Sequence, residues 1–485
     1  MLQPVRLAGA SRNRSGDSPL GEPCDDVSTE LNAEGPRTGA SGETTDRRFG
    51  LRKRRRAIYK RTALVLAGVM IPVGYSYVGA LTGPGADSFQ ARSVEWARDH
   101  RLGGLVDRLE QYWYSNHQAK VGGTPNLDQT GPQFAVAGIT IATAPTTSTL
   151  VAATAPTTST LVSTTAPTTS TLVSTTSAVA EATAPTATVA VQEPACILCG
   201  TPGATALSAP TDLVTPAATP VANEGHWQPF GSGDGHAVGM YVTSIRPDAV
   251  HTSVLDGVVW MDPSVLRFRH YPGLKVPGAP WDRPPNVEPA LHSQLVAAFS
   301  GGFRMNDSSS NGGMILAGRE LRAMREGGAT IVIDVNGVPN IGIWGRDFTT
   351  ADQLDSARQN LDLIVDNGAP VPDLATDPNK KWGFTGPKNN SAVWRSGTGI
   401  TANGALVWVG GPGLTVAALA ETLVRAGAIR GMQLEINQEW VQLNTYAAKA
   451  DGSARGTRLL PGMAHTGDRW LTPDTRDFVA VFNRG

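Results

Sequence analysis

The feature that most constrains this chain is a charge-free, largely apolar run at residues 62–82, "TALVLAGVMIPVGYSYVGALT". About 20 such residues in an α-helix suffice to cross the hydrocarbon core of a bilayer. The stretch just before it, "RRFGLRKRRRAIYKR" at residues 47–61, holds nine Arg or Lys and no acid. Basic residues beside a membrane helix stay on the cytoplasmic side. The sequence therefore predicts a single-pass helix in the cell membrane, with the N-terminus cytoplasmic and the later residues extracytoplasmic.

Two other interpretations of this region compete with a membrane anchor. A cleavable signal peptide usually has a short basic region and a shorter apolar core, whereas residues 1–61 all precede this apolar run. A basic run can also bind nucleic acid, but here it lies directly against the apolar segment. We therefore expect an uncleaved anchor and no nucleic acid partner. Pro72 is compatible with this, because membrane helices tolerate proline.

Two polar or amphipathic segments flank the predicted span. Residues 1–61 are rich in Gly, Ser, Asp and Glu, end in the basic run, and predict a disordered cytoplasmic tail. Residues 83–116 predict a short helical juxtamembrane segment, broken at Gly103-Gly104. The apolar positions of its helical faces are Val94, Ala97, Leu105, Leu109 and Trp113. The aromatic cluster Tyr112, Trp113 and Tyr114 can lie at the membrane interface or dock on the main domain.

A low-complexity stretch rich in Thr, Ala and Pro follows at residues 117–224. "APTTSTLV" occurs three times in it, and its prolines recur every eleven residues, which is too short a period for a solenoid repeat. We predict a stalk that holds a domain away from the membrane, either O-glycosylated or unmodified. Cys196 and Cys199 in this stretch form a local disulfide or remain free thiols, and Cys24 in the tail is expected to be a free thiol.

Most of the Trp, Phe and Gly falls in residues 225–485, which predicts one large globular domain there. Asn336-Gly337 and Asn403-Gly404 lie between apolar runs and predict two hairpins. The run "LTVAALAETLVRAGA" predicts a helix capped by Thr415 and stopped at Gly427, with a strand after it. A second helix is predicted at residues 350–368. This mixture predicts an α+β fold with a mixed, largely antiparallel sheet and packed helices.

The segment "MQLEINQEW", residues 432–440, places two acids and two amides at the end of a predicted strand. If Met432, Leu434 and Ile436 pack on the sheet, Gln433, Glu435 and Asn437 share the other face. Amides and carboxylates bind sugar hydroxyls, and an acid can protonate a leaving oxygen. A solvent-exposed strand with a polar edge explains the same pattern without any ligand.

Two further segments carry glycines beside arginine. "LVAAFSGGFRMN" ends an apolar run at Gly301-Gly302, where backbone N–H groups can approach an anion, and Arg304 follows. "AVWRSGTGIT" places Arg395 and Ser396 before a Gly-rich strand. Each also fits an ordinary turn or surface arginine. The histidines show neither HxxxH nor HExxH spacing, so no metal site is expected, and cofactors stay unassigned.

Taken together and in order, these segments resemble the phosphodiester glycosidase domain family. The resemblance covers roughly residues 235–483. The family loop NGG-F/Y-F is similar to "SGGFR", and its R-S/T-x-x-G strand start is similar to "RSGTG". Its helix followed by LDGGGS resembles "GLTVAALAETLVRAGAIRGMQLEINQ", and its closing RxVxxxL strand resembles "RDFVAVF" at 476–482. The family includes an enzyme that removes N-acetylglucosamine from a sugar phosphodiester, and envelope- or exopolysaccharide-associated bacterial proteins.

The resemblance implies a hydrolase that acts on a sugar phosphodiester or a related envelope glycan. Glu435 falls where the family has Asp, and the resemblance implies that Glu435 acts as the general acid or base. Arg304 and Arg395 would hold phosphate, with Gly301 and Gly302 beneath it. The sugar ligand would contact Ser396, Asn437 and Gln438, while Asp334, Asp366 and Glu439 are unranked candidates for a second carboxylate. Trp382, Trp440 or Trp470 would stack on sugar faces or belong to the core.

The chain also departs from this family. Ile436, Asn437 and Gln438 replace family glycines, and Ser300 replaces the Asn before the glycine pair. These side chains stand where the family backbone would approach a ligand, so catalysis is either kept with an altered substrate or lost. The alternative function is therefore a non-catalytic module that binds envelope polysaccharide or assists its biosynthesis.

Overall fold

The computed structural model describes the chain in nine stretches. They are residues 43–125, 205–230, 238–278, 281, 283–305, 312–372, 374, 382 and 391–484. The first part of the predicted tail, most of the predicted stalk with its repeats, and Cys24, Cys196 and Cys199 lie outside these residues. Residues 75–485 group into one unit, and residues 1–74 form another.

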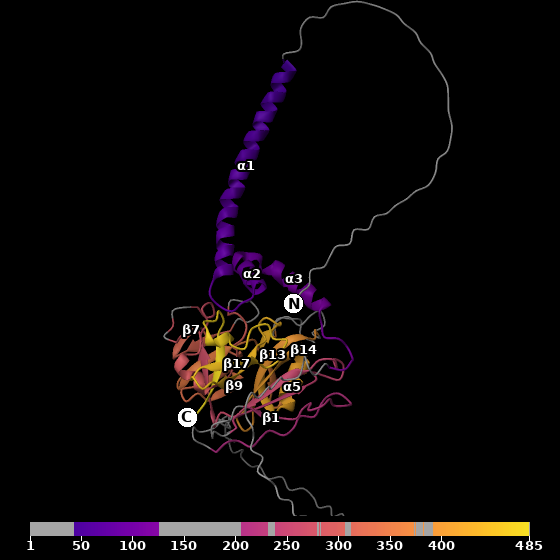
Figure 1. The fold of residues 1–485 in the computed structure, drawn as a ribbon, viewed down its shortest axis with the longest axis vertical. Coiled ribbons are helices and arrows are strands. Elements are labelled where there is room, and N and C mark those ends of the chain that lie inside the picture. Colours follow the sequence, from indigo (N-terminus) through magenta and orange to yellow (C-terminus); the bar gives the residue numbers. More distant parts are fainter. Residues whose placement is uncertain are drawn as a thin grey trace, which may run out of the picture. The chain divides into compact units, whose positions relative to one another are not determined.

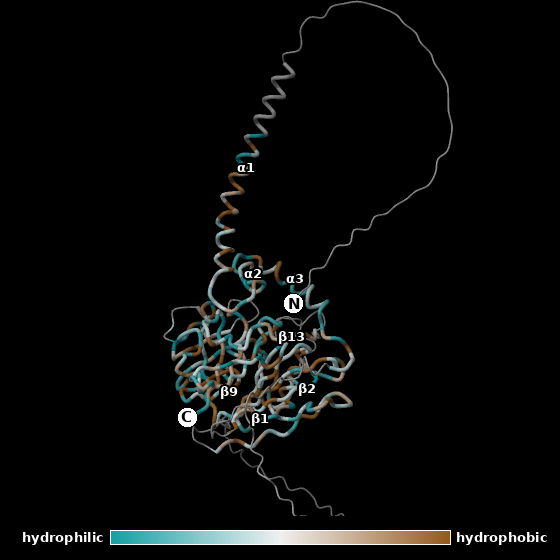
Figure 2. The backbone as a smooth tube through the Cα atoms, in the orientation of Figure 1, coloured by the Kyte–Doolittle hydropathy of each residue, from teal (hydrophilic) through white to brown (hydrophobic). Residues whose placement is uncertain are grey.

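A long N-terminal helix, α1 (Glu43–Thr82), contains the apolar run and Pro72. Its part from Ile58 to Thr82 is long and apolar enough to cross a membrane, and its most apolar window is not buried inside the protein. Figure 2 colours much of this half of α1 brown, as expected for apolar side chains. A candidate span is therefore present where the sequence predicted it, and the side of the membrane on which the N-terminus lies stays a prediction.

Two helices follow α1 in the juxtamembrane segment (Figure 1). They are α2 (Phe89–Ala97) and α3 (Gly103–Asn116), joined by the π-helical turn η1 (Arg98–Leu102). The predicted helical pair is present, but the break is not at Gly103-Gly104. It lies at His100 and Arg101, whose dihedral angles are not helical, and Gly103 begins α3.

The rest of this unit is built from three sheets. The first has the order β1 (Gln228–Phe230), β2 (Met240–Ile245), β3 (Asp256–Met261), β14 (Leu406–Leu414), β13 (Val393–Thr401), β15 (Ala428–Ile436), β11 (Leu363–Asp366), β12 (Ala369–Pro370). The second runs β7 (Arg319–Arg322), β6 (Met314–Leu316), β10 (Leu354–Gln359), β8 (Ala329–Asp334), β9 (Pro339–Ile343). The third runs β17 (Ala454–Arg458), β16 (Leu443–Ala448), β5 (Leu295–Ser300), β18 (Phe478–Asn483), β4 (Leu266–Tyr271).

Every pairing between these named strands is antiparallel. The largely antiparallel fold is therefore confirmed, with fewer helices than predicted. Both Asn-Gly turns form hairpins, β8–β9 and β13–β14. Neither loop is the two-residue turn that Asn-Gly suggested. Gly337 and Gly404 donate to the Asp334 and Thr401 oxygens, and only the glycine of each pair has positive φ, so each loop is a type I turn followed by a left-handed glycine.

The predicted helix after the second hairpin is α5 (Val416–Arg425). The Thr415 hydroxyl accepts the Ala418 N–H at 3.0 Å, which satisfies one of the free N–H groups of the first turn. Gly427 follows with φ of +91° and ends the helix. The apolar face of α5 packs on the eight-stranded sheet in a core that includes Leu419, Leu423 and Val409.

The second predicted helix, at residues 350–368, is wrong: this segment forms β10 and β11. The apolar spacing that suggested a helix also fits strands, because Ala357 is buried within a ladder and Leu361 turns the chain with φ of +62°. β10 pairs with β6 on one side and β8 on the other. Pairing on both edges outweighs a weak local helix preference.

Candidate active site

A β-bulge at the end of β15 determines where Glu435 points. Arg395 pairs with Ile436 while Gly397 pairs with Gln433, so β15 carries one extra residue against β13. The predicted alternation of faces is therefore wrong past Leu434. Met432 and Leu434 pack between the sheets, whereas Ile436 joins the core beneath α5. Glu435 instead faces charged groups from the other two sheets.

The Glu435 carboxyl group is buried and unusually isolated. Its residue is 2% exposed, and its backbone N–H donates to the Ser396 hydroxyl at 3.3 Å. Its carboxyl oxygens make no hydrogen bond or ion pair with any residue that the structure describes. Burial raises the pKa of Glu435 to about 8, although Arg476 and Arg358 act in the opposite direction. The side chain is therefore protonated at neutral pH.

Asp477 lies within electrostatic range of Glu435 and has the opposite protonation state. Its Oδ2 accepts the Arg358 Nε–H at 3.0 Å and lies 3.0 Å from His270 Nε2. Burial alone would raise the pKa of Asp477, but the Arg358 charge and the His270 hydrogen bond outweigh burial and hold it at about 2. The site thus combines one neutral and one ionised carboxyl group, the usual basis for assigning distinct acid and base roles.

The Gly301-Gly302 loop lies against this pair. Gly301 N–H donates to the Asp477 backbone oxygen at 3.0 Å, and a Cβ on Gly301 would lie 2.3 Å from Asp477 Oδ2. No other residue type fits there without a shift. Asn360 connects the loop to β15, because its amide donates to the Gln433 and Leu434 oxygens, both at 2.8 Å, and its Oδ1 accepts the Phe303 N–H at 3.3 Å.

Two more buried arginines, Arg469 and Arg476, lie next to Glu435. Arg469 donates to Asp474 at 2.6 Å, and the Arg476 guanidinium stacks on the Trp440 ring at 4.1 Å. Nη1 of Arg469 and Nη1 of Arg476 are buried without a hydrogen-bond acceptor, and Nε of Arg476 faces the Glu95 carboxylate at 3.8 Å, an ion pair without a hydrogen bond. Buried donors normally have partners. These unused N–H groups therefore indicate a place where water or an anion binds.

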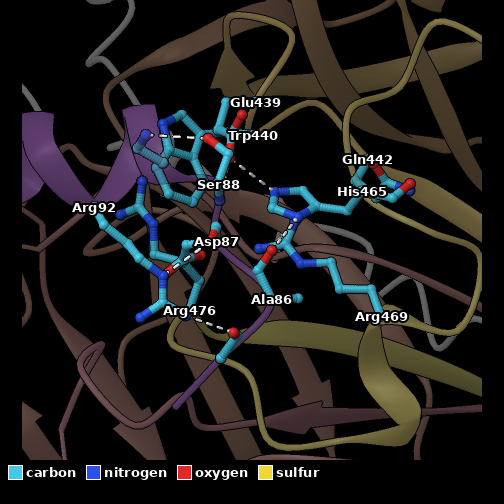
Figure 3. A network of polar contacts seen from close by, with 12 residues as sticks. Ala86, Asp87, Ser88, Arg92, Glu439, Trp440, Gln442, His465, Arg469 and Arg476 are labelled. Atoms are coloured by element: carbon cyan, nitrogen blue, oxygen red, sulfur yellow. Dashed lines mark hydrogen bonds and ion pairs between the residues drawn. The ribbon is translucent and has the colours of Figure 1, made fainter. Parts of the chain in front are cut away.

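A stretch before and within α2 covers these arginines (Figure 3). We call residues 86–99 the cover segment. The Ala86 oxygen lies 3.0 Å from His465 Nδ1, the Asp87 carboxylate accepts the Thr475 hydroxyl at 2.6 Å, and the Ser88 N–H donates to Glu439 at 3.1 Å. Asp87 keeps one buried oxygen without a donor. The site is thus closed by the chain that leads in from α1.

The glycosidase-like residues of the sequence do not all reach this site. Gly301, Gly302, Ser396 and Glu435 come together, but Arg395 does not join them. Arg395 lies on the α5 face of the sheet, where it donates to the Leu414 oxygen at 3.0 Å and to Gln433 Oε1 at 3.1 Å.

Arg304, Asn437 and Gln438 also have other partners. Arg304 donates to Asp99 of the cover segment at 2.6 Å. Asn437 turns the chain with φ of +71° and accepts the Glu439 N–H at 2.9 Å. Gln438 is exposed and donates to the Gly462 oxygen. Their predicted contacts with a sugar stay predictions.

Of the three candidates for a second carboxylate, Glu439 is the one that contacts a residue beside the buried arginines. It is 3.5 Å from His465 Nε2, whereas Asp366 pairs with Arg346 at 2.6 Å and Asp334 closes the β8–β9 turn. Trp382 and Trp470 are buried, and Trp440 is half-buried against Arg476.

Sequence reasoning missed Asp477, Arg358, Asn360, Arg469 and Arg476 as site residues. One signal was available. Arg476 and Asp477 open "RDFVAVF", which carries part of the family resemblance. Arg358 and Asn360 lie in the segment interpreted as a helix, where their convergence on β15 could not be seen. Within the part of the chain that the structure describes, no group of His, Cys, Asp or Glu is arranged to hold a metal ion.

No protein-family model matches this chain, and no curated protein matches it. Among solved structures, it is similar to the catalytic domain of zebrafish N-acetylglucosamine-1-phosphodiester alpha-N-acetylglucosaminidase, auto-inhibited by its pro-peptide. The identity is 14% and the TM-score 0.35, over 54% of this chain and 88% of that one. A hypothetical protein from Synechocystis shows 12% identity and a TM-score of 0.28, over 51% and 62%. The structural similarity to a phosphodiester glycosidase domain is therefore distant.

Proposed function

We propose that this protein is a hydrolase that cleaves the bond between a sugar and a phosphate group. The observation that carries the proposal is the pair of buried carboxyl groups, protonated Glu435 and ionised Asp477, beside arginines with unused N–H donors. The sequence motifs around Gly301 and Glu435 favour the same reaction class. The motifs suggested that Arg395 binds the anion; we propose Arg469 and Arg476 for this role instead.

In this proposal, Arg469 and Arg476 bind the phosphate group and stabilise its negative charge. Water adds to the anomeric carbon while the bond from that carbon to the phosphate oxygen breaks. The proton of Glu435 passes to the phosphate oxygen, and the proton released by the water restores the carboxyl group. Ionised Asp477 stabilises the positive charge on the sugar ring in the transition state.

The test uses the full chain in detergent micelles with a panel of sugar-1-phosphodiesters. Released sugar is the measurement. Glu435→Gln removes the acidic proton at constant shape, and we expect turnover to fall by about 100-fold or more. Glu421→Gln is the matched control, because Glu421 lies on the exposed side of α5. Release of no sugar from any panel member, or equal rates for the two variants, contradicts the proposal.

The closed state of the site favours one second candidate, a non-catalytic module that binds envelope polysaccharide. Glu435 is 2% exposed beneath the cover segment. Such a module binds glycan through other surfaces, so Glu435→Gln leaves its cellular function intact. Binding of an envelope glycan with no release of sugar supports this candidate.

We further propose that residues 62–82 anchor the protein in the cell membrane, with the N-terminus cytoplasmic and residues 83–485 extracytoplasmic. The apolar half of α1 and the nine basic residues at 47–61 support this orientation. An envelope glycan or sugar phosphate outside the cytoplasm is then the substrate class.

A further inference from the structure

The juxtamembrane helices carry an unusual set of exposed apolar side chains. We call them the outer face: Phe89, Leu102, Leu105, Leu109, Tyr112 and Trp113. After α1, these are all the exposed Phe, Leu, Tyr and Trp side chains in the described residues, and the other large apolar side chains exposed there are single valines. Scattered apolar residues need no partner, but a concentrated patch marks a contact surface.

The two sides of α3 have different environments. Leu105, Leu109, Tyr112 and Trp113 recur at i, i+4, i+7 and i+8, so they share one helical face. The adjacent face, with Val106 and Tyr114, is buried.

Contacts with the rest of the unit hold η1 and the buried side of α3 in place. Tyr114 belongs to the same core cluster as Ile436 and the α5 side chains. Arg98 joins η1 to α3 by ion pairs of 2.8 Å with Asp107 and with Glu110. Asp99 pairs with Arg304 at 2.6 Å. The outer face therefore stays exposed although its helix is docked on one side.

The end of the candidate membrane span lies against α2. The Tyr77 hydroxyl is 2.8 Å from the Ser93 hydroxyl, and the Trp96 indole N–H donates to the Ser76 hydroxyl at 3.0 Å. Only residues 83–88 separate the last residue of α1 from α2. The outer face is thus held where the chain leaves the proposed bilayer.

We propose that the outer face rests on the membrane, with its leucines and aromatics in the interfacial layer of the outer leaflet. Trp and Tyr are enriched at this level of a bilayer, and an apolar helix face lies in its plane. The exposed cations Arg101 and Arg108 flank the face, in reach of lipid phosphates. The inference rests on the proposed anchor at residues 62–82 and goes beyond the proposed hydrolysis.

Contact of the outer face with the membrane, which we call the seat, also changes the role expected for residues 126–204 of the predicted stalk. Residues 75–125 and the described residues after 204 belong to one unit, and Ala119 N–H donates to the Ala392 oxygen at 2.9 Å. The low-complexity stretch therefore leaves and re-enters the same unit instead of spacing the domain from the juxtamembrane helices. On a seated outer face, the cover segment lies between the membrane surface and the candidate active site.

Spin labels in the full chain, reconstituted in phosphatidylcholine nanodiscs, test this seat. Cys24, Cys196 and Cys199 are replaced by Ser, and one label is placed by Leu109→Cys. Val335→Cys is the matched control, because Leu109 and Val335 are 61% and 59% exposed. Val69→Cys reports the anchor. Relaxation by oxygen, which concentrates in lipid, is compared with relaxation by a water-soluble nickel chelate.

We expect oxygen to exceed nickel at position 109, with the reverse at position 335. Nickel exceeding oxygen at position 109 means that the face is in water and overturns the seat. Exclusion of both reagents there means that a protein covers the face, and also overturns it. A label at position 69 that is reached by nickel shows that the anchor itself is wrong, whereas a lipid-exposed position 69 with a water-exposed position 109 rejects the seat alone.

Discussion

At the residue scale, Glu435 is the side chain whose chemistry is set most strongly by its surroundings. A carboxyl group near three arginines would ordinarily be ionised, yet Glu435 receives no hydrogen bond on its carboxyl oxygens from the described part of the chain, and burial is the dominant influence. Asp477 shows the reverse balance, since direct contacts with Arg358 and His270 hold its pKa low. Direct contact with the Arg358 charge, together with the hydrogen bond to His270, therefore decides which of the two buried acids loses its proton.

The raised pKa of Glu435 predicts a pH-dependent stability. Its contribution to the free energy of unfolding is fully present below the ordinary pKa of Glu. It is lost as pH rises to about 8, where the buried group ionises. Glu435→Gln lacks this titration, so its melting temperature relative to wild type should rise between pH 5 and pH 8.5. Thermal unfolding of both proteins at the two pH values measures this, and a constant difference between them contradicts it.

At the scale of elements, the site is formed by the cover segment and by the C-terminal ends of strands β10 and β15. Arg358 is the last residue but one of β10, Asn360 follows that strand, and Glu435 lies on the bulged end of β15. The cover segment places the Asp87 carboxylate beside Arg469, at the position where an anion would find free donors. The chain thus supplies its own negative charge to an anion site.

This arrangement predicts that Asp87→Asn strengthens anion binding. The substitution keeps the size of the side chain and removes the negative charge that competes with phosphate for Arg469. Inorganic phosphate should then raise the melting temperature of Asp87→Asn at lower concentrations than it does for wild type. Asp107→Asn is the control, because Asp107 pairs with Arg98 on an exposed surface. An equal response of the two variants to phosphate rejects this role for Asp87.

At the scale of the whole molecule, residues 75–125 and 205–484 pack together in one unit, so residues 126–204 connect two points of that unit. The entropy of closing a connection grows only with the logarithm of its length. Tyr114 and Leu213 lie on either side of this connection, and both pack in the core on the α5 side of the sheet. Stability should therefore depend weakly on the stretch between them.

Halving residues 126–204 at constant composition should change the free energy of unfolding by only about 0.6 kcal/mol. Chemical denaturation of the full and shortened chains in the same micelles measures the difference. A loss of several kcal/mol, or a transition that splits in two, would show that the stretch does more than connect its ends.

The sequence alone determined the elements that depend on local patterns. The apolar run, the two Asn-Gly hairpins and the capped helix α5 follow from hydropathy, turn chemistry and capping, which act within about a dozen residues. Tertiary structure decided the rest. Partner strands turned residues 354–366 into β10 and β11, and a one-residue bulge redirected Glu435. The proximity of Glu435 and Asp477 depends on contacts between distant segments, and no local period in the chain encodes such contacts.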